Sequence, residues 1–130
     1  MNVIALTCVA ALGFLLFGLG LVVSALRGRE RSFSGHANDP SNLLHKLIRA
    51  HGNTSEYVAF IAVLVLYLGG HSPAPWVVWT MVAITVFRYA IVAGLIFAPS
   101  LDKPNPLRFI GALGTYVAGA ALCYALAHSA

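Results

Sequence analysis

The sequence predicts an all-α integral membrane protein, folded as a bundle of four transmembrane helices with both termini on the non-cytoplasmic side. Hydrophobic residues make up 59% of the 130 residues and charged residues only 9%, whereas about a quarter of a typical soluble domain is charged. The apolar residues are grouped in four runs, and each run is long enough to cross roughly 30 Å of hydrocarbon. The polar segments between them contain the glycines and prolines that interrupt helices.

The chain is expected to form one domain, residues 1–130, because its length suits a single small domain. The first run lacks the basic start and the cleavage site of a signal peptide, so it should remain as a transmembrane helix. Ser41 or Asn42 can cap the second run, and Trp76 and Trp79 can anchor the third at the membrane interface. The predicted spans are residues 3–26, 43–68, 76–98 and 107–127.

The basic residues predict the orientation in the membrane. With four spans, the first and third loops share one side, and all lysines and arginines except Arg88 belong to that side: Arg27, Arg29, Arg31, Lys46, Arg49, Lys103 and Arg108. By the positive-inside rule this side is cytoplasmic. We expect a bacterial inner-membrane protein whose polar site faces the cytoplasm. The net charge of +4 indicates no nucleic-acid binding, because the basic residues lie between apolar runs and form no basic tail.

A polar stripe opens the second span and is the strongest functional signal in the sequence. Arg49, Asn53 and Glu56 are spaced at i, i+4 and i+7, and His45 extends the stripe by one turn. These residues share one face of a helix with 3.6 residues per turn. Charged groups at this depth cost several kcal/mol unless they are paired or hydrated. The stripe therefore predicts a site that faces a protein interior or a hydrated cleft.

Other interpretations stay open. An ion pair of Glu56 with Arg49 or Arg88 could serve only to fix helix packing, and Arg108 could be an interfacial arginine that reaches the lipid headgroups. No histidine or cysteine spacing indicates a metal site, and the two cysteines are interpreted as small buried apolar residues. Small side chains recur every four residues along the last span, and they suit either packing within the subunit or a subunit interface: Gly111, Thr115, Gly119 and Cys123.

The segment R-A-H-G-N-T-S-E-Y, residues 49–57, resembles the R-x-x-x-N-x-x-E motif of the MAPEG family. These are the membrane-associated proteins of eicosanoid and glutathione metabolism, among them microsomal glutathione transferases and leukotriene C4 synthase. The four spans, the basic first loop and the Arg88–Tyr89 pair also fit this family. Two departures are Ala59, where eukaryotic relatives have a proline, and Ala93, where leukotriene C4 synthase has a second tyrosine.

The resemblance implies a homotrimer that binds glutathione, its co-substrate, between subunits. The glutathione-binding residues it implies are Arg49, His51, Asn53, Glu56, Tyr57, Arg88 and Tyr89. Arg108 would be the catalytic arginine that activates the thiol, and no metal is implied.

The function expected from this resemblance is a glutathione-dependent transferase or peroxidase acting on a lipophilic small-molecule electrophile that arrives from the bilayer. Membrane lipids are expected as further partners. The alternatives are a non-catalytic MAPEG-fold protein, acting as a scaffold or in ligand binding, and a small multidrug exporter. The exporter class needs a carboxylate in its first span, and residues 1–26 contain none.

Overall fold

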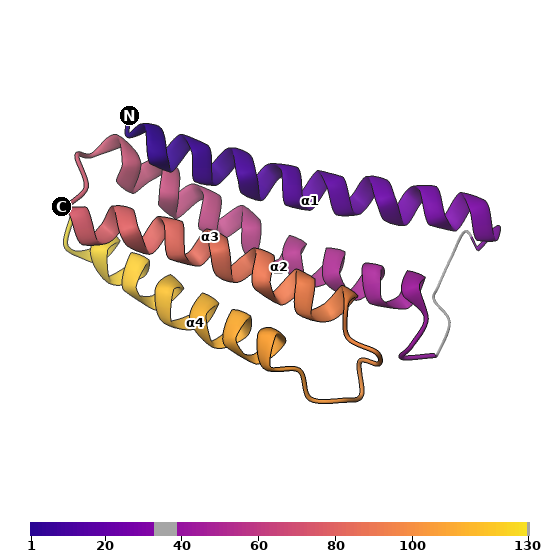
Figure 1. The fold of residues 1–130 in the computed structure, drawn as a ribbon. Helices are drawn as coiled ribbons and strands as arrows, with labels where there is room; N and C mark the ends of the chain where they lie inside the picture. The colour runs from indigo at the N-terminus through magenta and orange to yellow at the C-terminus, as the bar shows by residue number, and fades with distance from the viewer. Residues whose placement is uncertain (33–38, 130) are drawn as a thin grey trace.

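The computed structural model describes residues 1–32 and 39–129 of the chain. In this part the structure is all-α and consists of four helices: α1 (Val3–Glu30), α2 (Leu43–Gly70), α3 (Pro75–Ile96) and α4 (Pro106–Ala127). Each helix is long and apolar enough to cross a membrane, which confirms the predicted all-α architecture of four helices. Figure 1 shows both termini at one end of the bundle, and the end of α1, the start of α2 and the α3–α4 connection at the other. We call the latter the loop end.

The helix starts follow from local capping. The side chains of Asn2, Asn42 and Asn105 each accept a hydrogen bond from a backbone N–H in the first turn of the next helix, as expected for asparagine at this position. Helix α3 instead begins with Pro75, whose missing N–H needs no partner in a first turn. Asn42 was one of the two predicted caps.

Three helix ends differ from the predicted spans, and α2 ends at Gly70, two residues past its predicted end. Helix α1 continues four residues past Leu26 to Glu30, and its C-cap, Arg31, adopts a left-handed conformation with φ of 52°. Hydrophobicity marks only the part of a helix that suits lipid, whereas arginine and glutamate are good helix formers and prolong it. Helix α3 ends at Ile96, two residues before the predicted end.

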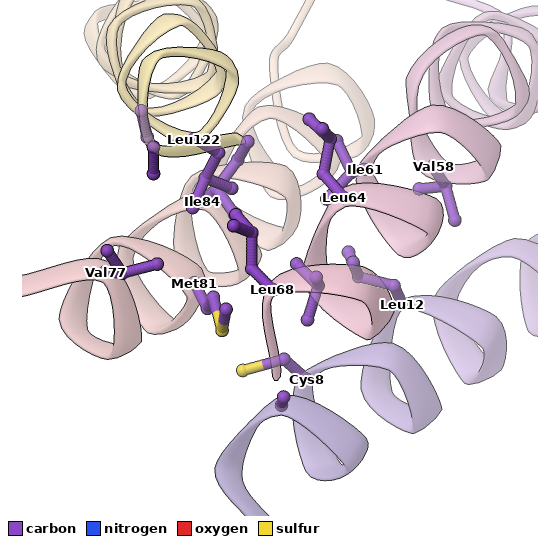
Figure 2. Packing of buried hydrophobic residues seen from close by; sticks show 14 residues of the cluster. Cys8, Leu12, Val58, Ile61, Leu64, Leu68, Val77, Met81, Ile84 and Leu122 are labelled. Atoms are coloured by element: carbon purple, nitrogen blue, oxygen red, sulfur yellow. The ribbon is translucent and has the colours of Figure 1, made fainter. Parts of the chain in front are cut away.

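The bundle has two apolar cores, which follow one another along its long axis. Helix α1 packs against α2 and α3, and α4 packs against α3 and α2. The core near the termini, part of which Figure 2 shows, is built around Leu12, Leu64, Val65, Met81, Ile84 and Leu122. The core near the loop end is built around Leu19, Leu44, Leu47, Ala50, Ile91 and Val92.

A layer of buried polar side chains lies between the two cores. Thr54, Thr85 and Thr115 each satisfy their hydroxyl by donating to a carbonyl four residues earlier in the same helix, at 2.7–2.8 Å. Arg88 is also buried here, with 1% of its surface exposed. A guanidinium cannot be satisfied within its own helix turn, so Arg88 needs partners from a neighbouring helix.

The row of small residues on α4 is used within the subunit at its loop-end half. A Cβ atom added at Gly111 would lie 2.6 Å from the backbone nitrogen of Ile91, so α3 and α4 approach closely there. At the other end of the row Cys123 is exposed. The interpretation of both cysteines as buried is therefore right for Cys8, which Figure 2 places in the core, and wrong for Cys123.

Candidate functional site

A cavity of about 350 Å³ opens at the loop end between α2, α3 and α4. Its polar side chains come from both flanking helices, and its apolar wall comes largely from α3. The residues that line it are His45, Arg49, Asn53, Ile91, Leu95, Leu101, Arg108 and Ala112. The structure thus brings three predicted site residues, Arg49, Asn53 and Arg108, together with His45 in one place. We call this the basic cavity.

The close approach of α3 and α4 puts Arg108 beside the stripe of α2. A Cβ atom added at Gly94 of α3 would lie 2.6 Å from the backbone nitrogen of Arg108, so only glycine allows this contact. The Arg108 guanidinium then donates through Nη1 to the carbonyl of Leu101 at 2.9 Å. The Leu101 N–H in turn donates to the carbonyl of Pro40 at 3.0 Å, which ties the α3–α4 connection to the segment before α2.

The charge of the basic cavity has one sign. Two guanidinium groups line it, together with an imidazole and an amide, and none of the residues lining it is acidic. Its volume falls within the range of small-molecule sites, about 300–1,000 Å³. Within residues 1–32 and 39–129, no three histidine, cysteine or acidic side chains lie close enough to hold a metal ion. The arrangement is chemically suited to carboxylates, which guanidinium groups bind through two parallel hydrogen bonds.

Arg88 lies behind this cavity and does not line it. Its Nη2 donates to the side-chain oxygen of Asn53 at 2.7 Å and to the backbone carbonyl of the same residue at 2.9 Å. The guanidinium also lies over the ring of Tyr57, 5.0 Å from the ring centre, at a distance where the cation is attracted to the ring face. From the sequence, the partner considered for Arg88 was Glu56, and the structure gives Asn53 and Tyr57 instead.

Glu56 lies about two turns deeper than Arg49, on a different surface. It is exposed and lines a second cavity of about 390 Å³ with Tyr57, Tyr116 and mostly apolar neighbours. The rings of Tyr57 and Tyr116 are 6.1 Å apart. In the described part of the chain no ion pair joins Glu56 to Arg49 or Arg88, so the purely structural salt bridge that the sequence left open is not formed there.

Two further predicted site residues point toward α1. A Cβ atom added at Gly20 would lie 3.3 Å from Nε2 of His51, so His51 packs against α1. The hydroxyl of Tyr89 donates to the carbonyl of Ala11, also on α1, at 2.8 Å. Neither side chain lines the basic cavity.

Sequence reasoning missed some residues around the site. Lys46 was counted only as a topological charge, yet it is buried and its Nζ donates to the carbonyl of Ala98 at 2.7 Å, joining α2 to the end of α3. Tyr116 carried no distinguishing signal, because aromatic residues occur throughout the apolar runs. Leu101 lines the cavity from a connection whose path cannot be read from its sequence.

Comparison with known proteins gives one finding. The sequence model of the MAPEG family matches residues 5–128, nearly the whole chain. No curated protein sequence and no solved structure matches it. The family match confirms the resemblance drawn from residues 49–57.

Proposed function

This chain belongs to the MAPEG family, and we propose that it is a glutathione-dependent transferase or peroxidase that activates the glutathione thiolate for attack on lipophilic electrophiles. The observation that carries this proposal is the basic cavity, where Arg49, Asn53 and Arg108 converge without any acidic side chain in the lining. Glutathione carries two carboxylates and one ammonium group at neutral pH. An anionic peptide is therefore a better match for this cavity than a metal ion or a neutral lipid.

The proposed chemistry uses the positive charge of the cavity to ionise the thiol. A free thiol has a pKa of about 8.5, and the thiolate is the nucleophile. A guanidinium within hydrogen-bond reach stabilises the thiolate and lowers its pKa. We assign this role to Arg108, whose Nη1 is already held by the Leu101 carbonyl and whose other donors remain for the ligand. The thiolate sulfur then bonds to the electrophilic carbon, the leaving group departs with its electron pair, and the thiol proton passes to water.

Glu56 and Tyr57 are proposed to bind the ammonium end of the peptide. Both line the second cavity, about 10 Å farther along α2 from Arg49. In the single chain Glu56 is exposed within a helix long enough to cross the membrane, and a carboxylate facing lipid is costly. A homotrimer would remove this cost if a neighbouring subunit and the ligand cover Glu56. The site would then be completed between subunits.

We further propose that the basic cavity faces the cytoplasm. All lysines and arginines except Arg88 lie at or near the loop end, which favours the cytoplasmic side under the positive-inside rule. Cytoplasmic glutathione would enter there. The lipophilic substrate would come from the bilayer, where the walls of the second cavity are mostly apolar.

The test is calorimetric titration of the purified protein in detergent with glutathione, followed by thiolate absorbance and conjugation of chlorodinitrobenzene. We expect Arg49→Ala to weaken glutathione binding at least tenfold, because charge-assisted hydrogen bonds contribute about 1.5–3 kcal/mol. Glu56→Ala should weaken binding as well. Arg108→Ala should reduce the thiolate signal and turnover more than it reduces binding.

Lys103→Ala is the matched control, because it removes one exposed positive charge from the α3–α4 connection without touching the cavity lining. It should bind and turn over like the unmodified protein. If the protein binds glutathione but forms no thiolate and no conjugate, the alternative of a non-catalytic ligand-binding protein replaces the enzyme. Normal binding by both Arg49→Ala and Glu56→Ala would show that the site is wrongly placed.

A further inference from the structure

The contact between Arg88 and Asn53 determines more than helix packing. A single nitrogen, Nη2 of Arg88, reaches both the side-chain oxygen and the backbone carbonyl of Asn53, at 2.7 and 2.9 Å. Arg88 itself is almost completely buried and lies in the polar layer between the two apolar cores. The side chain of Asn53, by contrast, reaches the basic cavity. The two residues thus connect the interior of the bundle to the wall of the cavity.

This contact decides which way the Asn53 amide points. An asparagine side chain has one oxygen that accepts and one nitrogen that donates, and the two ends exchange places when the amide rotates. A guanidinium has five donors and no acceptor. Only the oxygen of Asn53 can therefore face Nη2, and the rotated form would set two donors against each other. The Nδ2 group is then the end left for a ligand.

With this orientation, Arg49, Arg108 and Asn53 all offer donors to the basic cavity. Guanidinium groups cannot accept hydrogen bonds, and the one side chain of the three that could accept has its oxygen engaged by Arg88. A carboxylate or a peptide carbonyl is the complementary ligand group. The two guanidinium groups offer no acceptor to an ammonium group, and the Asn53 oxygen faces Arg88.

We propose that Arg88 is a positioning residue, which fixes Asn53 as a hydrogen-bond donor and so makes the basic cavity selective for carboxylate and carbonyl oxygens. This inference rests on the proposed function for the identity of the ligand as glutathione. It differs from the sequence expectation for Arg88, which acts through Asn53 and does not touch the ligand. It also assigns Asn53 a direction, as a donor to the ligand.

The decisive variant is Asn53→Asp, which has nearly the same shape. Its carboxylate keeps an oxygen toward Arg88 and presents a second oxygen, in place of the Nδ2 donor, to the cavity. The comparison variant Asn53→Ala removes both interactions. In detergent, we expect the melting temperature of Asn53→Asp to equal or exceed that of the unmodified protein, and that of Asn53→Ala to be lower. Glutathione affinity should follow a different order, with Asn53→Asp weakest and at least tenfold below the unmodified protein.

These two orders separate a positioning role from a structural one. If Arg88 and Asn53 only hold the helices together, a stable Asn53→Asp protein binds glutathione normally, and that result overturns the inference. Arg88→Lys, which retains a charged donor, should keep more affinity than Arg88→Met. Equal affinity of these two variants, if both fold, also contradicts the inference. The Asn53→Asp measurement decides the question if either Arg88 variant fails to fold.

The titrations are run in parallel with glutathione and with glutarate, a plain dicarboxylate. If the unmodified protein binds glutathione and Asn53→Asp binds it equally well, the inference fails and the proposed function stands. If the unmodified protein binds glutarate but not glutathione, the proposed function fails. Weaker binding of glutarate by Asn53→Asp than by the unmodified protein then supports the inference. Binding of neither ligand overturns both.

Discussion

Replacing Gly111 with alanine tests how closely α3 and α4 must approach to form the basic cavity. The added Cβ atom would lie 2.6 Å from the backbone nitrogen of Ile91 and 2.9 Å from its Cα. The shorter distance is about 0.8 Å below the 3.4 Å at which contact becomes ordinary. Because the obstructing atoms belong to the backbone, no side-chain rotation relieves the clash and the helices must separate. Overpacking of this kind costs about 1–3 kcal/mol.

The same displacement should weaken ligand binding. Ile91 and Arg108 line the cavity from α3 and α4, and Gly111 lies less than one turn from Arg108. Separating the two helices moves Arg108 away from Arg49 on α2. We therefore expect Gly111→Ala to lose glutathione affinity in addition to stability.

The assay is reversible unfolding of the purified protein in mixed detergent and dodecyl sulfate micelles, with calorimetric titration of glutathione on the same samples. Gly18→Ala is the matched control, because a Cβ atom there meets nothing within 4 Å. In the control, alanine should leave stability unchanged or raise it by up to about 1 kcal/mol, since alanine favours helix more than glycine does. If Gly111→Ala is as stable as Gly18→Ala, the close approach of α3 and α4 is not required and the reasoning is refuted.

Two further predictions concern the loop end. Lys46→Met should lower the free energy of unfolding by about 1.5–3 kcal/mol, because it removes a buried charge-assisted hydrogen bond to the Ala98 carbonyl. Lys103→Met at an exposed position is its control, and equal stability of the two variants would contradict the prediction. The hydroxyl and backbone N–H of Ser41 donate to the Asp39 carboxylate and lower its pKa below the ordinary value. This pKa should rise in Ser41→Ala, as measured by carboxyl NMR titration. The stabilisation from a lowered carboxylate pKa is present above the unfolded-state pKa of about 3.9 and is lost as the pH falls through the folded-state pKa. If the pKa of Asp39 is the same in Ser41→Ala as in the unmodified protein, the hydroxyl has no role in lowering it.

The sequence by itself determined the elements of this protein and its family. Long apolar runs in lipid have to be helices, because each backbone polar group must be satisfied within its own segment. Polar breaks and asparagine caps such as Asn42 then placed the helix starts within a residue or two. The spacing of Arg49 and Asn53 predicted that they share one helix face, and both line the basic cavity. Glu56, predicted on the same stripe, lines the second cavity instead.

Only the tertiary structure decided which polar groups meet. Arg88 is distant from Asn53 in sequence, and its pairing with Asn53 depends on the axial offset between α3 and α2. Arg108 reaches the cavity because Gly94 lets the two backbones touch, which depends on the path of the α3–α4 connection. A helical repeat fixes directions within one helix but neither the rotation nor the axial offset between helices. Those are set by the fit of side chains across the interface, and no single helix contains that information.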